Sequence, residues 1–363
     1  MRPYLTEKFG NPSALYAMGR ESRQAVEEAR QKVASLIGAS PEEVIFTSGG
    51  SESDNMALWG VLLARQDGRN HIVTTNVEHH AVLETAEYLM GHGYAATFVG
   101  VDSSGLVDPE DVRRAIRPET AIVSVMHANN EIGTIEPVEE IAAVCREAGA
   151  YLHTDAVQTV GNIPVDVSEL GVDLLSMSGH KLYGPKGVGA IFIKKGTRIS
   201  RFIHGGEQER RMRAGTENIG GIVGLGAAAE LAAGEMDAKV PRITALRDRL
   251  RDGLLAAIDG AFLNGHAERR LPNNVHLRIR LIEGEAICLQ LDTVGICSST
   301  GSACTSETLE PSHVLLAIGV PAHEAHGSLR FSLGRGTTAE EVDYVIEKLP
   351  PIVKRLRAMS PLK

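Results

Sequence analysis

Lys181 lies in the stretch of the chain whose residue types are best suited to covalent chemistry. It follows an apolar run and precedes a rigid Gly/Pro loop, residues 184–187, with Ser178 and His180 beside it. A lysine held in a crevice can have a lowered pKa and can form a Schiff base with a carbonyl group. The neighbouring hydroxyl and imidazole groups are suitable donors to a phosphate. A surface loop lysine is the alternative, and it fits Lys186 better than Lys181.

A second candidate is a phosphate-binding turn at residues 48–55, which follows an apolar run and opens a helical pattern. Gly49 and Gly50 let an anion approach bare backbone N–H groups at the positive end of a helix. Ser51 and Asp54 have the spacing of a capping box, so an ordinary capped helix start is the alternative. The segment has neither a Walker A nor a G-x-G-x-x-G pattern, which disfavours nucleotide binding.

Polar groups that follow three further apolar runs would suit a ring-shaped ligand. His79 and His80 have no C-x-x-C or H-E-x-x-H pattern near them, so no metal site is expected, and an imidazole here suits ring stacking and proton transfer. Asp155 is either a helix N-cap or a carboxylate that keeps a heterocyclic nitrogen protonated. Asn129 and Asn130 offer amide donors to the same crevice.

The four cysteines differ in their neighbours, and their number is far too small for a disulfide scaffold. Cys145 and Cys288 lie in apolar periodic segments and are expected to be inert core residues. Cys297 ends an apolar run and is expected to be buried as well. Cys304 stands among Gly, Ser, Thr and Ala residues, which predicts an exposed loop where a thiol persists because its reactivity is used.

The elements that would position these groups alternate along the first two-thirds of the chain. Helical patterns include residues 20–37, which stop at Gly38, and one with Pro137 at its first helical position and Gly149 at its end. The pattern predicts a doubly wound, mostly parallel α/β sheet of seven strands, whose carboxyl ends bind ligands. The apolar runs are residues 44–47, 71–75, 96–99, 121–125, 151–154, 174–177 and 189–193.

The pattern changes after about residue 236, where a long helical stripe runs from Ile243 to Ile258. Strand-like segments follow at residues 274–279, 286–291 and 328–333. Thr338 and Glu341 form a capping box for a closing helix. We therefore expect a large α/β domain at residues 1–236 and a smaller α+β domain at residues 237–363, with residues 1–19 packing against the smaller one.

The composition excludes several classes of protein. The 363 residues carry 37 Lys and Arg against 46 Asp and Glu, a formal net charge of −9. This balance argues against nucleic-acid binding, which needs clustered basic side chains. No apolar run approaches the roughly 20 residues of a membrane span, and the polar start, MRPYLTE, is unlike a signal peptide. A soluble cytoplasmic protein is expected.

A phosphate loop, a stacking histidine, an aspartate for a ring nitrogen and a Schiff-base lysine on successive strand ends together describe a pyridoxal-phosphate site. In that order, and with the Cys304 loop, the chain resembles the class I cysteine desulfurases of the NifS/IscS type. The resemblance runs from about Tyr4 to Leu356. Its most specific stretches are SGHKLYGPKG at residues 178–187, RAGTEN at 213–218, TGSAC at 300–304 and LRFSLGR at 329–335.

The resemblance implies a fold-type I homodimer with sites built across the subunit interface, and pyridoxal 5'-phosphate as the cofactor. Lys181 would carry the Schiff base, Asp155 would face the pyridine nitrogen, Gln158 the ring oxygen, and His79 would stack on the ring. Asn130 and Arg330 would bind the substrate carboxylate, and Cys304 in the small domain would be the nucleophile. His79 and Lys181 would carry protons. The phosphate would be held by Gly50, Ser51, Ser178 and His180, with Thr216 from the neighbouring subunit.

The implied reaction converts L-cysteine to L-alanine and leaves a persulfide on Cys304. The acceptor would be an iron–sulfur scaffold protein or a sulfur carrier for thiolated tRNA or cofactors, and the long loop at residues 297–310 favours class I over class II. A selenocysteine lyase or β-eliminating lyase remains an alternative. Family members usually open with an Asn-Asn-Ala-Thr-Thr-like segment, whereas this chain begins at what resembles the segment after it. A second alternative is therefore a poorly active homologue that serves as a scaffold. An aminotransferase would leave Cys304 unexplained.

Overall fold

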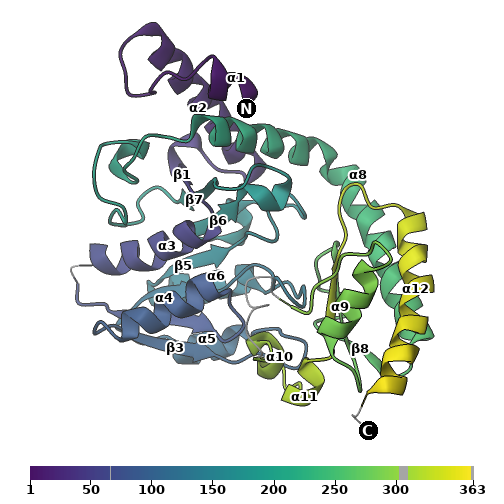
Figure 1. Ribbon diagram of the computed structural model, residues 1–363. Coiled ribbons are helices and arrows are strands. Elements are labelled where there is room, and N and C mark those ends of the chain that lie inside the picture. Colours follow the sequence, from purple (N-terminus) through teal and green to yellow (C-terminus); the bar gives the residue numbers. More distant parts are fainter. Residues whose placement is uncertain (66, 302–309, 361–363) are drawn as a thin grey trace. The chain divides into compact units, whose positions relative to one another are not determined.

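The computed structural model describes residues 1–65, 67–301 and 310–360 (Figure 1). The chain forms two compact units, and each unit is built from separate segments. Unit 1 comprises Met1–Val99, Asp108–His127 and Glu136–Met236. Unit 2 comprises Gly100–Val107, Ala128–Ile135 and Asp237–Lys363.

Unit 1 contains a seven-stranded sheet with the strand order β1-β7-β6-β5-β4-β2-β3. Strand β7 is antiparallel to both neighbours, and the other pairs are parallel, so the predicted doubly wound α/β fold is confirmed. Each strand lies within one residue of its predicted run at either end. The strands are β1 (Val44–Thr47), β2 (His71–Thr75), β3 (Ala95–Val99), β4 (Thr120–Ser124), β5 (Tyr151–Asp155), β6 (Leu174–Ser178) and β7 (Gly189–Ile193).

Helices cover this sheet because its strands are apolar on both faces. Strands β2, β4 and β6 are buried along their whole length. The core beside α3 joins Met56 and Val61 of that helix to Ile72 and Ile122 of the sheet. The helices are α1 (Arg2–Thr6), α2 (Ala17–Leu36), α3 (Gly50–Ala64), α4 (His80–Met90), α5 (Pro109–Ala115), α6 (Val138–Ala148) and α7 (Val167–Leu170), with the 3₁₀ turns η1 (Pro41–Glu43), η2 (Gly179–Leu182) and η3 (Glu209–Arg211).

Two predicted helix starts differ from the structure. Pro137 stands at the N-cap of α6 rather than at its first helical position, and Gly149 ends that helix with a φ of 67° as predicted. The capping box predicted for α3 is wrong, because Gly49 is the N-cap and Ser51 already lies in the first turn. Asp54 is 1% exposed and takes no part in capping. The helix begins two residues earlier than the capping box required, so Asp54 is its fifth residue and lies beyond the first turn, where a capping side chain must stand.

Unit 2 contains a three-stranded antiparallel sheet in the order β10-β9-β8, with β8 (Ala261–Leu263), β9 (Asn274–Ile279) and β10 (Ser328–Ser332). The strands predicted at 274–279 and 328–333 are confirmed. The strand predicted at 286–291 is wrong, because this segment lies in a helix whose Ile287 and Leu291 face the core one turn apart. The helices are α9 (Gly284–Asp292), α10 (His313–Ala317), α11 (Ala322–Ala325) and α12 (Ala339–Met359), and α12 has the predicted capping box of Thr338 and Glu341.

Helix α8 (Ile219–Ala257) extends the predicted helical stripe toward the N-terminus, and the division between the two units falls within it, after Met236. By length and composition alone, α8 contains a window apolar enough to cross a membrane, which departs from the expectation that no run approaches that length. Its side chains Ile222, Leu225 and Ala229 are nevertheless buried in unit 1, as in the core helix of a globular protein.

Candidate active site

Several of the predicted site residues of unit 1 gather at the carboxyl edge of its sheet. Asp155 and Ser178 are the last residues of β5 and β6, and His79 is the N-cap of the helix that follows β2. Gly50 opens the helix that follows β1. Strand β1 is antiparallel to β7, which is antiparallel to β6, so β1 and the parallel strands end at the same edge. This edge is where doubly wound folds bind ligands.

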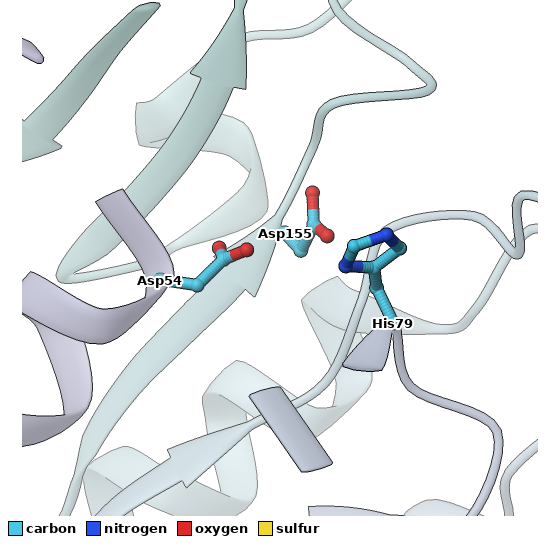
Figure 2. A group of neighbouring side chains, drawn as sticks. All are labelled: Asp54, His79 and Asp155. Carbon is cyan, nitrogen blue, oxygen red and sulfur yellow. The ribbon is translucent and has the colours of Figure 1, made fainter. Parts of the chain in front are cut away.

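Asp54, His79 and Asp155 form a compact cluster at this edge. Figure 2 shows the two carboxyl groups and the imidazole ring pointing toward one another, and one ligand atom from each lies within 4.8 Å of the others. Asp155 is 4% exposed. The Nδ1 atom of His79 accepts a hydrogen bond of 3.1 Å from the N–H of Ala81, which places the proton of the neutral ring on Nε2. The sequence predicted His79 and Asp155 for this place but not Asp54.

The surroundings of the Asp155 carboxyl suit binding to a cation. Burial raises its pKa to about 6, while the N–H of Val157, 2.9 Å from Oδ1, and the charge of Lys181 act in the opposite direction. A positively charged heterocycle placed against this group would offset the cost of burial and favour the ionised form. The arrangement therefore fits the predicted partner of a protonated ring nitrogen.

The start of α3 and the end of β6 form a cradle suited to a phosphate. A Cβ atom at Gly50 would lie 2.7 Å from Cγ2 of Val157, so this space depends on glycine. Ser178 is buried, and its Oγ lies 2.9 Å from Nδ1 of His180. Desolvation, followed by the charges of Lys181 and Lys186, lowers the pKa of His180. Backbone N–H groups, a hydroxyl and an imidazole are suitable hydrogen-bond donors to a phosphate group.

The remaining predicted residues of unit 1 lie on exposed or half-buried turns. Lys181 is exposed in η2, and Ser51 is exposed in the first turn of α3. Gln158 is half-buried three residues after Asp155. Thr216 is exposed and lines a pocket of about 230 Å³.

Glu52, which the sequence did not single out, ties the segment that carries Thr216 to helix α3. Its Oε1 accepts a hydrogen bond of 2.9 Å from Nε of Arg213, and its Oε2 accepts one of 2.9 Å from the N–H of Ser48. An ion pair between residues so far apart in the chain leaves no periodic signal, which explains why the sequence did not reveal it.

The residues predicted to bind the substrate carboxylate lie together in unit 2. Nη1 of Arg330 donates a hydrogen bond of 2.9 Å to the backbone oxygen of Asn130. Ser299 pairs with Arg330 through both backbone groups, at 2.6 and 3.2 Å. The third predicted group of this unit, the nucleophile Cys304, lies outside the described residues.

The three described cysteines are free thiols with different environments. Cys145 is buried as predicted, and burial raises the pKa of its thiol to about 12. Cys288 is half-buried against the core of unit 2, and burial likewise raises its pKa. Cys297 is exposed, which corrects the expectation that it is buried. It follows the end of the apolar segment that closes with Ile296, and the chain turns outward there.

Comparisons with known proteins identify relatives along the whole chain. The family model "Aminotransferase class-V" matches residues 1–345. The cysteine desulfurase IscS of Dictyoglomus turgidum is 54% identical over 363 residues, which is 100% of this chain and 92% of that protein. The enzyme of the same name from Methanosarcina thermophila is 53% identical and covers 100% of this chain and 89% of its own length.

Solved structures are also similar to this chain over nearly its whole length. A structure titled as a NifS-like protein superposes with a TM-score of 0.91 at 40% sequence identity, covering 98% of this chain and 94% of its own. Another, titled as SspA in complex with cysteine, superposes with a TM-score of 0.81 at 32% identity, covering 93% of this chain and 94% of its own.

Proposed function

The chain belongs to the aminotransferase class-V family, and from this membership we propose that it is a pyridoxal-phosphate-dependent cysteine desulfurase. The observation that carries the proposal is the end of β5, where Asp155 and His79 meet beside the glycine cradle of α3. Relatives more than half identical over the full chain are named cysteine desulfurases, and one similar structure is titled as a complex with cysteine. The substrate is accordingly L-cysteine.

The residues described above would hold the cofactor, whose bound ring supplies an electron sink for charge that develops at Cα of the amino acid. Lys181 would attach it through its amine. Asp155 would face the ring nitrogen, Gln158 the ring oxygen, and His79 the ring face. The phosphate would be held by Gly50, Ser51, Ser178 and His180, with Thr216 of the partner subunit completing the site in a homodimer.

Arg330 and Asn130 would bind the substrate carboxylate, because a planar guanidinium matches a carboxylate in two parallel hydrogen bonds. The thiolate of Cys304 would attack the sulfur of the substrate, so that a sulfur–sulfur bond forms as the carbon–sulfur bond breaks. His79 and Lys181 would carry the protons that leave and return to the substrate carbon atoms. L-Alanine is then released, and the persulfide stays on Cys304.

The persulfide would pass to an acceptor such as an iron–sulfur scaffold protein or a sulfur carrier. The small number of cysteines is ordinary for a protein of a reducing compartment, and we infer a cytoplasmic location from it. Residues 1–236 would form the cofactor-binding domain and residues 237–363 the small domain that carries the nucleophile. The division of the described units after Met236 supports this boundary, while the short segments Gly100–Val107 and Ala128–Ile135 belong to unit 2 as well.

The direct test is product analysis with L-cysteine and a reductant, run in parallel on the wild type and on Cys304→Ala. The wild type should yield alanine and sulfide in equal amounts, and the variant should yield neither while keeping its bound cofactor. Undiminished sulfide release by the variant would instead identify a β-eliminating or selenocysteine lyase, which needs no enzyme thiol. Partner binding without turnover by the wild type would identify a scaffold.

The role of Lys181 is tested by absorbance. In Lys181→Ala the band of the lysine-bound cofactor should be absent, because the amine that attaches the cofactor has been removed. Lys186→Ala is the matched control, since that lysine is exposed on the neighbouring loop. A band that persists in Lys181→Ala would show that another group holds the cofactor.

A further inference from the structure

Asp54 is a buried carboxyl group to which the proposed reaction assigns no role. It projects from α3 toward Asp155, its side chain is 1% exposed, and it belongs to the cluster whose ligand atoms lie within 4.8 Å of one another (Figure 2). An ionised carboxylate is costly at such a depth unless a cation or several hydrogen bonds accompany it. The groups around Asp54 therefore decide which form it takes.

The electrostatic neighbours of Asp54 are acids. Asp155 on β5 and Glu78 on the segment before α4 both act on it, and both raise its pKa further after burial. Glu78 is itself completely buried, and its Oε1 accepts hydrogen bonds from the N–H of Met126 at 2.8 Å and from Oγ1 of Thr75 at 2.9 Å. Three buried carboxyl groups that raise one another's pKa cannot all be ionised at once.

The imidazole of His153, beside Asp54, supplies no positive charge. Nε2 of His153 lies 3.6 Å from Oδ1 of Asp54, but burial lowers the pKa of His153 to about 3, so the ring is neutral. Its ring nitrogens lie 2.8 Å from Oγ of Ser124 and 2.9 Å from Oγ of Ser176. Ser176 also hydrogen-bonds to the carboxyl of Asp54 and lowers its pKa, but burial and the charge of Asp155 outweigh this effect and leave the pKa well above its usual value. Neutral hydroxyl and imidazole groups thus line this side of the carboxyl.

The negative charge of the pair is better placed on Asp155. Its Oδ1 accepts the N–H of Val157 at 2.9 Å, and the positive charge of Lys181 acts on it. Within the described part of the chain, no group hydrogen-bonds to Oδ1 of Asp54. With a proton on Asp54, these contacts form a chain in which the acid donates to Ser176, Ser176 donates to Nε2 of His153, and Nδ1–H of His153 donates to Ser124. With Asp54 ionised, each of these donors would be reversed, so the tautomer of His153 reports the protonation of Asp54.

We propose that Asp54 is a positioning residue that keeps its proton and thereby holds the single negative charge of the Asp54–Asp155 pair on Asp155, where the ring nitrogen of the cofactor needs it. The role assigned to Asp54 rests on the proposed function, but the protonation of Asp54 can be tested without it. A neutral Asp54 leaves Asp155 free of a second buried anion and holds its surroundings in place through Ser176.

The protonation of Asp54 is read by infrared difference spectroscopy of the cofactor-free protein at pH 8. The wild type should show the carbonyl band of a protonated carboxyl group that is absent from Asp54→Asn and present in Asp155→Asn. Aspartate labelled with ¹³C in the wild type should shift this band, which separates it from that of Glu78 without any substitution. A wild-type spectrum with no label-sensitive band would overturn the proposal.

The effect on the cofactor is read by absorbance as a function of pH in the loaded protein. Asp54→Asn, a neutral isostere, should keep the wild-type titration midpoint, whereas Asp54→Leu, which cannot bond to Ser176, should shift it. A shift of one pH unit or more in Asp54→Asn would mean that an anion was removed, and the proposal would be wrong. Failure of L-cysteine turnover alone would contradict the proposed function and leave both spectroscopic results standing.

Discussion

Arg330 and Asn130 lie 200 residues apart in the chain, yet Nη1 of Arg330 donates a hydrogen bond of 2.9 Å to the backbone oxygen of Asn130. Both belong to unit 2, and β10, which carries Arg330, also pairs with Ser299. The bond restrains the orientation of the guanidinium, and a two-point contact with a carboxylate depends on that orientation. The main chain at Asn130 is therefore part of the proposed substrate site.

Replacing Arg330 with lysine should weaken substrate binding while preserving the charge. A lysine offers a point charge without the planar pair of donors, so we expect a loss of about 2 kcal/mol, or roughly 30-fold in kcat/KM for L-cysteine. Steady-state kinetics measure this loss. Asn130→Ala is the matched variant, because it retains the backbone oxygen that orients Arg330 and removes only a neutral side-chain donor. Its loss should be several-fold smaller, and equal losses would contradict this assignment.

The stability of the cofactor-free protein should depend on the charge of Asp155. Burial raises the pKa of this carboxyl from 3.8 to about 6, so between these values the folded state binds more protons than the unfolded state. Its contribution to stability is therefore complete at low pH and is lost as pH rises through about 6. In Asp155→Asn no carboxyl ionises at this position, so this loss of stability at higher pH does not occur. Urea unfolding at pH 7.5 should therefore find the cofactor-free variant more stable than the wild type by about 1 to 3 kcal/mol.

At pH 4 this advantage should nearly vanish, because Asp155 is then protonated in the wild type as well. The same variant should bind pyridoxal phosphate more weakly, since the ring nitrogen loses its anionic partner. A stability difference that is independent of pH would mean that Asp155 is not the titrating group.

A methyl group at Gly50 should obstruct the cofactor. Its Cβ would lie 2.7 Å from Cγ2 of Val157, so in Gly50→Ala the side chain of Val157, helix α3 or the turn after β5 must shift. Because the same turn positions Asp155, we expect the dissociation constant for pyridoxal phosphate to rise by about tenfold, equivalent to about 1.4 kcal/mol, in a fluorescence titration. Gly234→Ala is the control, because no described atom lies within 4 Å of the added Cβ in that helix. Equal affinity in both variants would refute the steric argument.

Removing the charge of Glu209 should destabilise unit 1. Its Oε2 lies 2.7 Å from Nη1 of Arg30, its Oε1 lies 2.8 Å from Nη2, and both side chains are 3% exposed. Oε2 also accepts the N–H of Phe46 at 2.8 Å. Glu209→Gln leaves the buried guanidinium with only the half-exposed Glu27, 3.2 Å from its Nε, as a counter-ion, and the free energy of unfolding should fall by about 3 kcal/mol.

The exposed pair of Lys32 and Glu230, 2.8 Å apart, provides the comparison for this loss. Glu230→Gln should change the free energy of unfolding by less than about 0.5 kcal/mol, because water and salt screen an exposed pair. Similar losses in the two variants, measured by urea unfolding, would show that burial does not govern the Arg30–Glu209 interaction.

The sequence predicted the sheet of unit 1 well because each strand is short, apolar on both faces and bounded by turn residues. The order of polar groups after these strands then located Asp155, Ser178 and His79 at one edge, since parallel strands end together. The resemblance to known desulfurases added their expected roles. Periodicity alone does not provide these roles.

The wrong predictions, such as the strand at residues 286–291, share a physical cause: the apolar residues of a short segment can fit the spacing of a strand and of a helix. Residues 286–291 are apolar enough for a strand, but the spacing of Ile287 and Leu291 fits a helix equally well, and packing against the core of unit 2 decided the outcome. Asp54 has the spacing of a capping residue, and its burial beside Asp155 overrides that local preference. Contacts between residues distant in the chain, such as Glu52 with Arg213, leave no local pattern at all.

Because unit 2 is built from three separate segments of the chain, its parts are synthesised at different times. Val107 and Ile132, both buried in the finished protein, lie in the two short segments Gly100–Val107 and Ala128–Ile135, which leave the ribosome long before the rest of their unit. At roughly 5–20 residues per second, the segment Asp237–Lys363 takes on the order of ten seconds to follow. During that interval the nascent chain presents apolar side chains without their final neighbours, which is a natural point for chaperone assistance.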